Sequence, residues 1–155
     1  MGGIRGRQGK YFLLYNSKKL KRMAERIKCV LLIDDDEDDN YFHSLVLKKT
    51  GIIDEVRIAE NATEAISLLR AEDFNPELIF LDINMPGING WELLDKFDTD
   101  IRHINSVIVM LTTSMSPADK KRAENSERIY RFETKPLNRA KIRAILAAVF
   151  DILLE

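Results

Sequence analysis

The sequence lacks the features that mark several large classes of protein. Cys29 is the only cysteine, which excludes a disulfide framework and a multi-cysteine metal site and fits a reducing compartment. No apolar run approaches the roughly 18 residues that a membrane-spanning helix needs. Glycine and proline are sparse, with seven and four residues, which excludes a collagen-like or low-complexity polymer. We therefore expect a soluble, cytoplasmic, globular protein.

Charge is balanced overall but uneven along the chain. The 155 residues, enough for one domain, carry a net charge of −1. Residues 1–22 hold seven basic residues and no acidic one, whereas the rest holds 17 basic and 25 acidic residues, or −8. We interpret residues 1–26 as a basic extension, either disordered or upstream of a native start at Met23, and residues 27–155 as the domain. An arm that binds nucleic acid or acidic lipid is the less favoured alternative.

From residue 28 onward, short apolar runs alternate with amphipathic stretches. The runs at 29–33, 56–59, 78–81, 107–111 and 129–132 are typical of buried strands. Helices are predicted at about 38–49, where Phe42, Leu45 and Val46 are apolar, then from Asn61 past Leu69, through Phe97, near Pro117, and from Ile142 to Leu153. This alternation predicts an α/β fold with an open, doubly wound, five-stranded parallel sheet.

Polar residues follow four of the five predicted strands. The carboxyl ends of parallel strands share one edge, where such folds bind ligands, so we expect these residues to converge there: Asp34, Asp35, Asp82, Thr112 and Lys135. Grouped carboxylates favour a hard cation such as Mg²⁺. An ammonium and a hydroxyl suit phosphoryl oxygens. The set indicates phosphoryl transfer to a carboxylate, with Asp82 as nucleophile.

Four sequence blocks carry a specific resemblance. They are Leu32–Asp36, Phe80–Gly87, Val109–Thr113 and Thr134–Pro136. In order and spacing, over about residues 27–153, the chain resembles response regulator receiver domains, close to stand-alone chemotaxis-type receivers. The resemblance implies a flavodoxin-like (βα)5 fold with strand order 2-1-3-4-5.

The resemblance also implies roles at the strand ends. Asp82 would be the phosphoacceptor, receiving a phosphoryl group from a sensor histidine kinase or a histidine phosphotransfer protein. Mg²⁺ would be bound by the side chains of Asp35 and Asp82 and by the backbone carbonyl of Asn84, with Asp34 acting mainly through a metal-bound water. We expect a phosphorylation switch and not an enzyme.

Five further residues take roles from the same resemblance. Lys135 would pair with the phosphoacceptor and then with the phosphoryl group, Thr112 would move to hydrogen-bond that group, and Phe132 would turn inward on activation. Thr113 and Ser114 would tune access to the site and the lifetime of the acyl phosphate.

Two charged segments have open interpretations. Residues 36–39 are interpreted as a solvated loop and the acidic start of the first helix. The basic residues of 120–122, with Arg128 and Arg131, form either a solvated surface or a partner contact. They fall on the face made by the fourth helix, fifth strand and fifth helix, through which a homodimer could form.

Two other functions compete with the switch. A haloacid-dehalogenase-type phosphatase would use Asp34-x-Asp36 as its Asp-x-Asp motif, although Glu37 and Asp38 do not supply the residues expected next. A phosphorylation-independent binding module would need an occluded site. With the chain ending soon after the last predicted helix, we expect no output domain and signalling by contact.

Overall fold

Five strands and five helices alternate along the part of the chain that this computed structural model describes, residues 26–101, 104–113, 115–152 and 154. The strands are β1 (Ile27–Ile33), β2 (Ile53–Ala59), β3 (Leu78–Asp82), β4 (Val107–Thr112) and β5 (Ile129–Thr134). The helices are α2 (Glu37–Lys48), α3 (Ala62–Leu69), α4 (Gly90–Thr99), α5 (Pro117–Asn125) and α6 (Arg139–Phe150). The interpretation of residues 1–25 as an extension lies outside the described residues. Arg26 is described and donates a hydrogen bond to the carbonyl of Gly51 at 2.7 Å.

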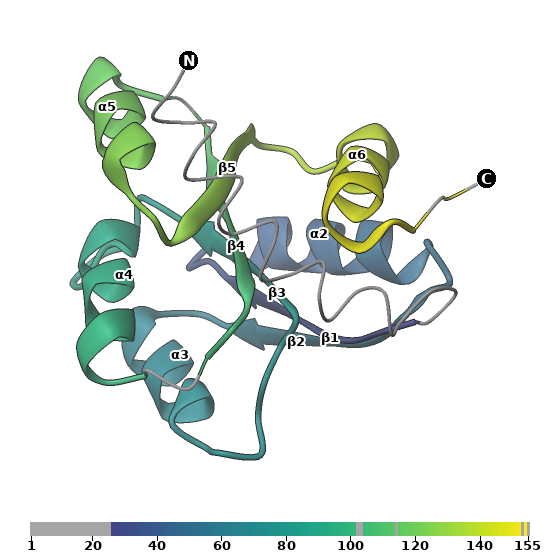
Figure 1. Cartoon of the computed structure of the whole chain (residues 1–155), viewed down its shortest axis with the longest axis horizontal. Coiled ribbons are helices and arrows are strands. Elements are labelled where there is room, and N and C mark those ends of the chain that lie inside the picture. The colour runs from purple at the N-terminus through teal and green to yellow at the C-terminus, as the bar shows by residue number, and fades with distance from the viewer. Residues whose placement is uncertain (1–25, 102–103, 114, 153, 155) are drawn as a thin grey trace.

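The strands form one parallel sheet in the order β2-β1-β3-β4-β5 (Figure 1). The register places Ile33, the last residue of β1, beside Ala59 of β2 and Leu81 of β3. Neighbouring strands therefore end at nearly the same level. The predicted flavodoxin-like (βα)5 fold is confirmed, and so is its strand order.

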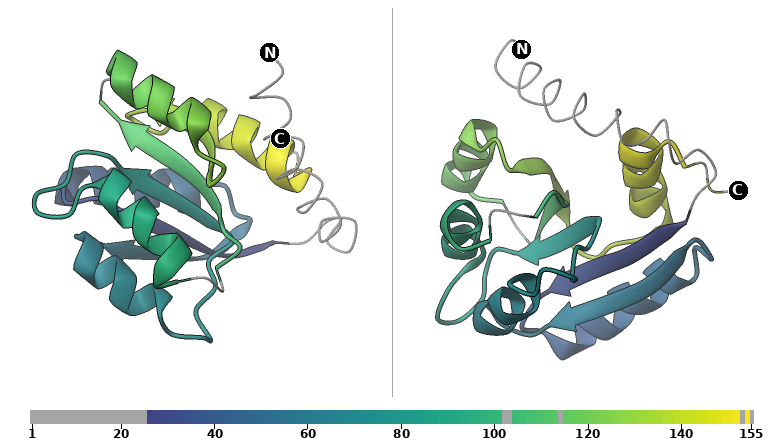
Figure 2. Two further views of the ribbon diagram at one scale, coloured as in Figure 1. Left: turned by 60° about the vertical axis from the view of Figure 1, so that its left-hand side comes forward. Right: turned by 60° about the horizontal axis from the view of Figure 1, so that its bottom comes forward.

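Helices cover both faces of the sheet. α2 and α6 lie on one face, and α3, α4 and α5 lie on the other (Figures 1 and 2). Successive residues of β1 point to opposite faces, as a strand requires. Val30 and Leu32 join the cluster under α2 and α6, whereas Leu31 and Ile33 join the cluster under α3 and α4.

Each helix begins after a side chain that accepts a hydrogen bond from the backbone of its first turn, which satisfies N–H groups that lack a partner within the helix. These N-cap residues are Asp36, Asn61, Asn89, Ser116 and Asn138. The starts predicted at Asn61 and near Pro117 are confirmed, the latter with Pro117 in the first turn.

Gly90 allows α4 to begin directly against the end of β3. A Cβ atom at this position would lie 2.3 Å from the carbonyl oxygen of Asp82, closer than any side chain can approach. The Gly90 N–H donates to the carbonyl of Ile83 at 2.9 Å. The backbone next to Asp82 is thereby held by the first residue of α4.

Two details differ from the sequence prediction. Phe42 and Leu45 mark the first helix by their apolar character, yet they are 46% and 38% exposed. The buried residues of α2 are mostly polar, namely Asn40, His43, Ser44 and Leu47, because this helix begins at the polar edge of the sheet.

α6 ends at Phe150, and Asp151 takes a left-handed conformation with φ 57°. The prediction that this helix continues toward Leu153 is wrong for Asp151 and Ile152, because the left-handed conformation of Asp151 ends the helix; Leu153 lies outside the described residues. Among the described helices, none has the length and apolar content needed to cross a bilayer.

Candidate functional site

Three carboxylates meet where β1 and β3 end. Asp34 and Asp35 follow β1, and Asp82 is the last residue of β3. One carboxylate oxygen from each residue lies within 4.8 Å of the other two. Asp34 and Asp82 are buried, while Asp35 is exposed. Because β1 and β3 are neighbours in the sheet, the structure brings these three predicted residues together.

The donor set of this cluster is suited to a hard cation. The ligand atoms on offer are carboxylate oxygens, which Mg²⁺ prefers together with water. A cation here would also relieve the repulsion between the three carboxylates. The residues present therefore fit Mg²⁺. Asn84, the further predicted ligand, is exposed and lies two residues after the end of β3.

The environment of Asp82 disfavours its charged form. Burial, and then the nearby Asp34 carboxylate, raise the pKa of Asp82 to about 7. Lys135 and a backbone hydrogen bond from Asn84 act in the opposite direction and offset this only in part. A bound cation would favour the ionised carboxylate, which is the nucleophilic form.

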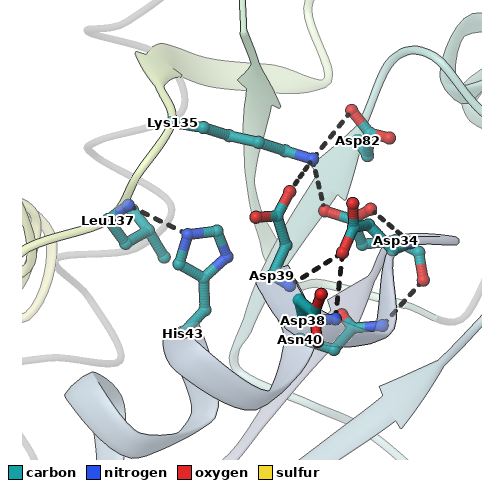
Figure 3. Close-up of polar contacts among 9 residues, drawn as sticks. Asp34, Asp38, Asp39, Asn40, His43, Asp82, Lys135 and Leu137 are labelled. Carbon is teal, nitrogen blue, oxygen red and sulfur yellow. Dashed lines mark hydrogen bonds and ion pairs between the residues drawn. The ribbon is translucent and has the colours of Figure 1, made fainter.

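Lys135 reaches the carboxylates from the loop after β5. Its Nζ atom lies 2.6 Å from Asp34 Oδ2, 2.9 Å from Asp39 Oδ2 and 3.6 Å from Asp82 Oδ1 (Figure 3). Burial alone would lower the pKa of Lys135, but the hydrogen bonds to Asp34 and Asp39 and the charge of Asp82 raise it. The expected pair of Lys135 with Asp82 is present, and it is the longest of the three.

The sequence interpretation of residues 36–39 as a solvated loop and helix start holds for Asp36, Glu37 and Asp38, which are exposed, and is wrong for Asp39. Asp39 contacts Lys135, and the Asp36 side chain accepts hydrogen bonds from the N–H groups of Asp38 and Asp39. The reason is the direction of α2, whose first turn lies beside the strand ends. An acidic run gives no sign of which member faces inward, so sequence reasoning missed Asp39.

Thr112 lies where the switch residue was expected. It is the last residue of β4, it is fully buried, and its carbonyl accepts a hydrogen bond from the Lys135 N–H at 2.8 Å. The predicted threonine and lysine are thus connected through the backbone. Thr113 is exposed beside them, and the prediction for Ser114 lies outside the described residues.

Phe132 lies on the opposite side of the sheet from α2 and is part of an aromatic contact. Its ring centroid is 5.9 Å from that of Trp91 in α4, and both side chains pack on the core under α3 and α4. Trp91 Nε1 donates to Asp119 Oδ1 of α5 at 2.8 Å. Asp119 was not singled out in the sequence, because one carboxylate on a polar helix carries no distinguishing pattern.

The basic residues near α5 mostly have partners within the domain. Arg122 lies 3.0 Å from Asp95 and above the Trp91 ring, with its guanidinium carbon 4.7 Å from the ring centroid. Arg128 donates to Asp98 at 2.7 Å. Arg131 pairs with Glu133 at 3.0 Å. Lys120 and Lys121 are exposed, so of this set they are the residues best placed to meet a partner.

The chain belongs to the response regulator receiver domain family, which matches residues 30–147. Receiver domains are the signalling domains of two-component response regulators. The match includes β1, β3, β4 and β5, whose ends build the site. It confirms the resemblance drawn from the four sequence blocks.

Individual proteins agree with this assignment. The two-component response regulator ARR22 of Arabidopsis thaliana is 29% identical over 122 residues, covering 79% of this chain and 83% of that protein. Protein PilH of Pseudomonas aeruginosa is 30% identical over 91 residues, covering 59% and 72%. A two component response regulator structure from Cytophaga hutchinsonii has a TM-score of 0.74 and 32% identity, covering 83% of this chain and all of that one. A structure of the chemotaxis protein CheY4 of Vibrio cholerae has a TM-score of 0.64 and 26% identity, covering 79% of this chain and 98% of that one.

Proposed function

We propose that this receiver accepts a phosphoryl group on Asp82 from a phosphohistidine of a sensor histidine kinase or a histidine phosphotransfer protein. One observation carries the proposal: a buried carboxylate lies beside two further carboxylates and a lysine ammonium at one edge of the sheet. Three carboxylates without a metal would repel the negatively charged phosphoryl group, so the site needs Mg²⁺ to supply positive charge. Asp35 and Asp82, with the backbone carbonyl of Asn84, would hold that ion, and Asp34 would act mainly through a metal-bound water.

In the proposed transfer, an oxygen of the Asp82 carboxylate attacks the phosphorus atom. An O–P bond forms while the N–P bond breaks, and the electron pair of the N–P bond returns to the imidazole nitrogen of the donor. Lys135, with a positive charge that its carboxylate neighbours stabilise, would contact the phosphoryl oxygens. Thr112 would donate its hydroxyl to them.

We propose that the modified site signals through the face made by α5, β5 and α6. Thr112 lies beside Thr134 of β5 in the sheet, and Phe132 on the same strand contacts Trp91. Movement of Thr112 toward a phosphoryl group would shift β5 and this aromatic pair, and so bias the position of α5. A cytoplasmic partner or a second copy of the chain would bind the altered face. The proposal needs no output domain, and the similar proteins ARR22 and PilH are matched over most of their own length.

The phosphatase alternative finds no support at the same residues. Its Asp-x-Asp motif would need Asp36 as an acid facing the nucleophile Asp34. The Asp36 side chain instead caps α2, so its oxygen is occupied by backbone N–H groups.

The test is a phosphate-affinity gel shift after incubation with acetyl phosphate. We expect a Mg²⁺-dependent shift in the wild type, lost on chelation and in Asp82→Asn. Asp38→Asn, which removes an exposed carboxylate, is the matched control and should shift as the wild type does. If Asp82→Asn still shifts, the phosphoacceptor is another residue. If the wild type shifts neither with acetyl phosphate nor with phosphorylated histidine donors, the proposal is wrong. Thr113→Ala, run in parallel, measures whether the Thr113 side chain limits access of the phosphodonor to Asp82.

A further inference from the structure

The segment that carries Lys135 is held by α2 at two points. Asp39 binds the Lys135 ammonium, Nζ to Oδ2, at 2.9 Å. One turn later on the same helix, His43 Nε2 accepts a hydrogen bond from the Leu137 N–H at 3.1 Å. Residues four apart share a helix face, and Figure 3 shows both side chains reaching toward the loop after β5. α2 therefore holds the loop at two places, at the backbone of Leu137 and at the side chain of Lys135.

The position of Asp39 places it in competition with the phosphoacceptor. The Lys135 ammonium lies 0.7 Å closer to Asp39 than to Asp82, at 2.9 Å against 3.6 Å. The Lys135 side chain is only 8% exposed, so these contacts are shielded from water, whereas the Asp39 side chain is 34% exposed. Asp39 can therefore be released to solvent at small cost, while the buried Asp34 carboxylate, 2.6 Å from the Lys135 ammonium, remains as its anionic partner.

We propose that Asp39 is a positioning residue that holds Lys135 away from Asp82 in the unmodified domain and is exchanged for the phosphoryl group when Asp82 is modified. His43 keeps the loop backbone in place during this exchange, so that the lysine side chain moves and the loop does not. The inference rests on the proposed phosphorylation of Asp82. Asp39 would then destabilise the phosphorylated state, because its negative charge competes for the Lys135 ammonium and repels the incoming phosphoryl dianion.

The first experiment measures the affinity of the full chain for beryllofluoride with Mg²⁺, a phosphoryl mimic, by isothermal titration calorimetry. Asp39→Asn keeps the shape and an accepting oxygen but loses the charge. We expect its Kd to fall roughly three- to tenfold, as replacement of a charged hydrogen bond by a neutral one in the competing state predicts. Asp39→Glu should restore a Kd near that of the wild type. Asp38→Asn removes the same charge one residue away, on an exposed side chain, and should change the Kd less than twofold.

Several results would overturn the inference. An unchanged or weaker affinity in Asp39→Asn would show that Asp39 does not compete with the phosphoryl group. An equal gain in Asp38→Asn would reduce the effect to the general negative charge of this helix end. A purely structural role would lower the urea midpoint of Asp39→Asn and leave the Kd unchanged.

A second measurement separates this inference from the proposed function. In the metal-free protein, the ammonium protons of Lys135 should exchange slowly enough to be seen by ¹⁵N NMR, because the ammonium is buried and hydrogen-bonded. We expect their exchange to accelerate several-fold in Asp39→Asn and not in Asp38→Asn. Failure of the wild type to bind beryllofluoride would count against the proposed function, whereas unchanged exchange in Asp39→Asn would count against the positioning role of Asp39.

Discussion

At the scale of single residues, the site gathers groups whose charges conflict in the absence of a ligand. Asp82 is buried beside Asp34, and Lys135 is shared among three carboxylates. Such an arrangement is costly for folding, because each buried charge loses its hydration and like charges repel. The chain keeps it at the one edge where a cation and a phosphoryl group would change the balance.

The cost can be measured at Asp82. Its folded pKa of about 7 lies above the ordinary value of 3.8, so the folded state binds the proton more tightly than the unfolded state. The stability lost on ionisation accordingly grows as pH rises from about 4 and is complete above about 7. A rise of about three pKa units corresponds to roughly 4 kcal/mol, so we expect Asp82→Asn to stabilise the metal-free protein by up to about that amount at pH 8 and by little at pH 4.

Urea unfolding in the presence of a chelator, at both pH values, checks this expectation. Asp38→Asn serves as the control and should show no gain that depends on pH in this way. Equal stability of Asp82→Asn and wild type at pH 8 would mean that burial and the nearby Asp34 charge do not destabilise the ionised Asp82 carboxylate.

At the scale of the elements, α5 is attached in a different way from the other helices. α2, α3, α4 and α6 bury several residues each, whereas none of the described residues of α5 is buried. It is held to α4 through Asp119 with Trp91 and through Arg122 with Asp95, and partly buried Ala123 packs on the core. Polar contacts on a helix surface contribute little each, which makes α5 the helix that a small change at β5 can displace.

Asp119 is the central contact of this attachment. It accepts from Trp91 and closes a capping box with Ser116, so Asp119→Ala removes both interactions. We expect amide hydrogen exchange in residues 117–125 to accelerate by about tenfold, as the loss of about 1–2 kcal/mol from one cap and one hydrogen bond predicts. Exchange in β1 and β3 should change much less.

Asp95→Ala is the matched control for this prediction. It removes only the exposed pair with Arg122 and should accelerate exchange in α5 by less than about twofold. If Asp119→Ala accelerates exchange equally in the helix and in the sheet, α5 does not open on its own, and its proposed role as the responding element is weakened.

At the scale of the whole molecule, the site exists because neighbouring strands of one sheet end at the same level. Asp34, Asp35 and Asp82 come from the ends of β1 and β3, so they form a cluster only in the folded chain. A ligand that binds this cluster and not the unfolded chain must stabilise the fold.

We therefore expect Mg²⁺ to raise the melting temperature of the chelated protein. At about ten times its Kd, Mg²⁺ should add about 1.4 kcal/mol, which corresponds to roughly 3–6 °C for a chain of this size. Differential scanning fluorimetry at pH 8 measures the shift, with NaCl of equal ionic strength as the control. Asp35→Asn should abolish most of this shift, because Asp35 is a proposed ligand of the ion. The variant should still fold, since Asp35 is exposed and its replacement leaves the core intact. An equal shift with NaCl would show general screening and no bound ion.

Sequence patterns sufficed for the fold and for most of the site. Buried strands need continuous apolar runs and helices need a 3.6-residue period, so the alternation of elements can be read from local sequence. The first polar residue after each apolar run marks where that strand ends, which is enough to place Asp34, Asp82 and Thr112 at one edge. The match of residues 30–147 to the receiver family agrees with that reasoning.

The sequence did not predict which way a side chain points or which distant residue it contacts. The acidic run at residues 36–39 looks uniform, and only the path of α2 past the strand ends makes Asp39 a partner of Lys135. Likewise His43 on α2 and Leu137 before α6 are 94 residues apart and meet through the packing of their helices. The sequence by itself determined which residues lie at the edge of the sheet, because that follows from local hydrophobicity. The tertiary structure decided which of them touch, because contact depends on how separate helices pack against the sheet.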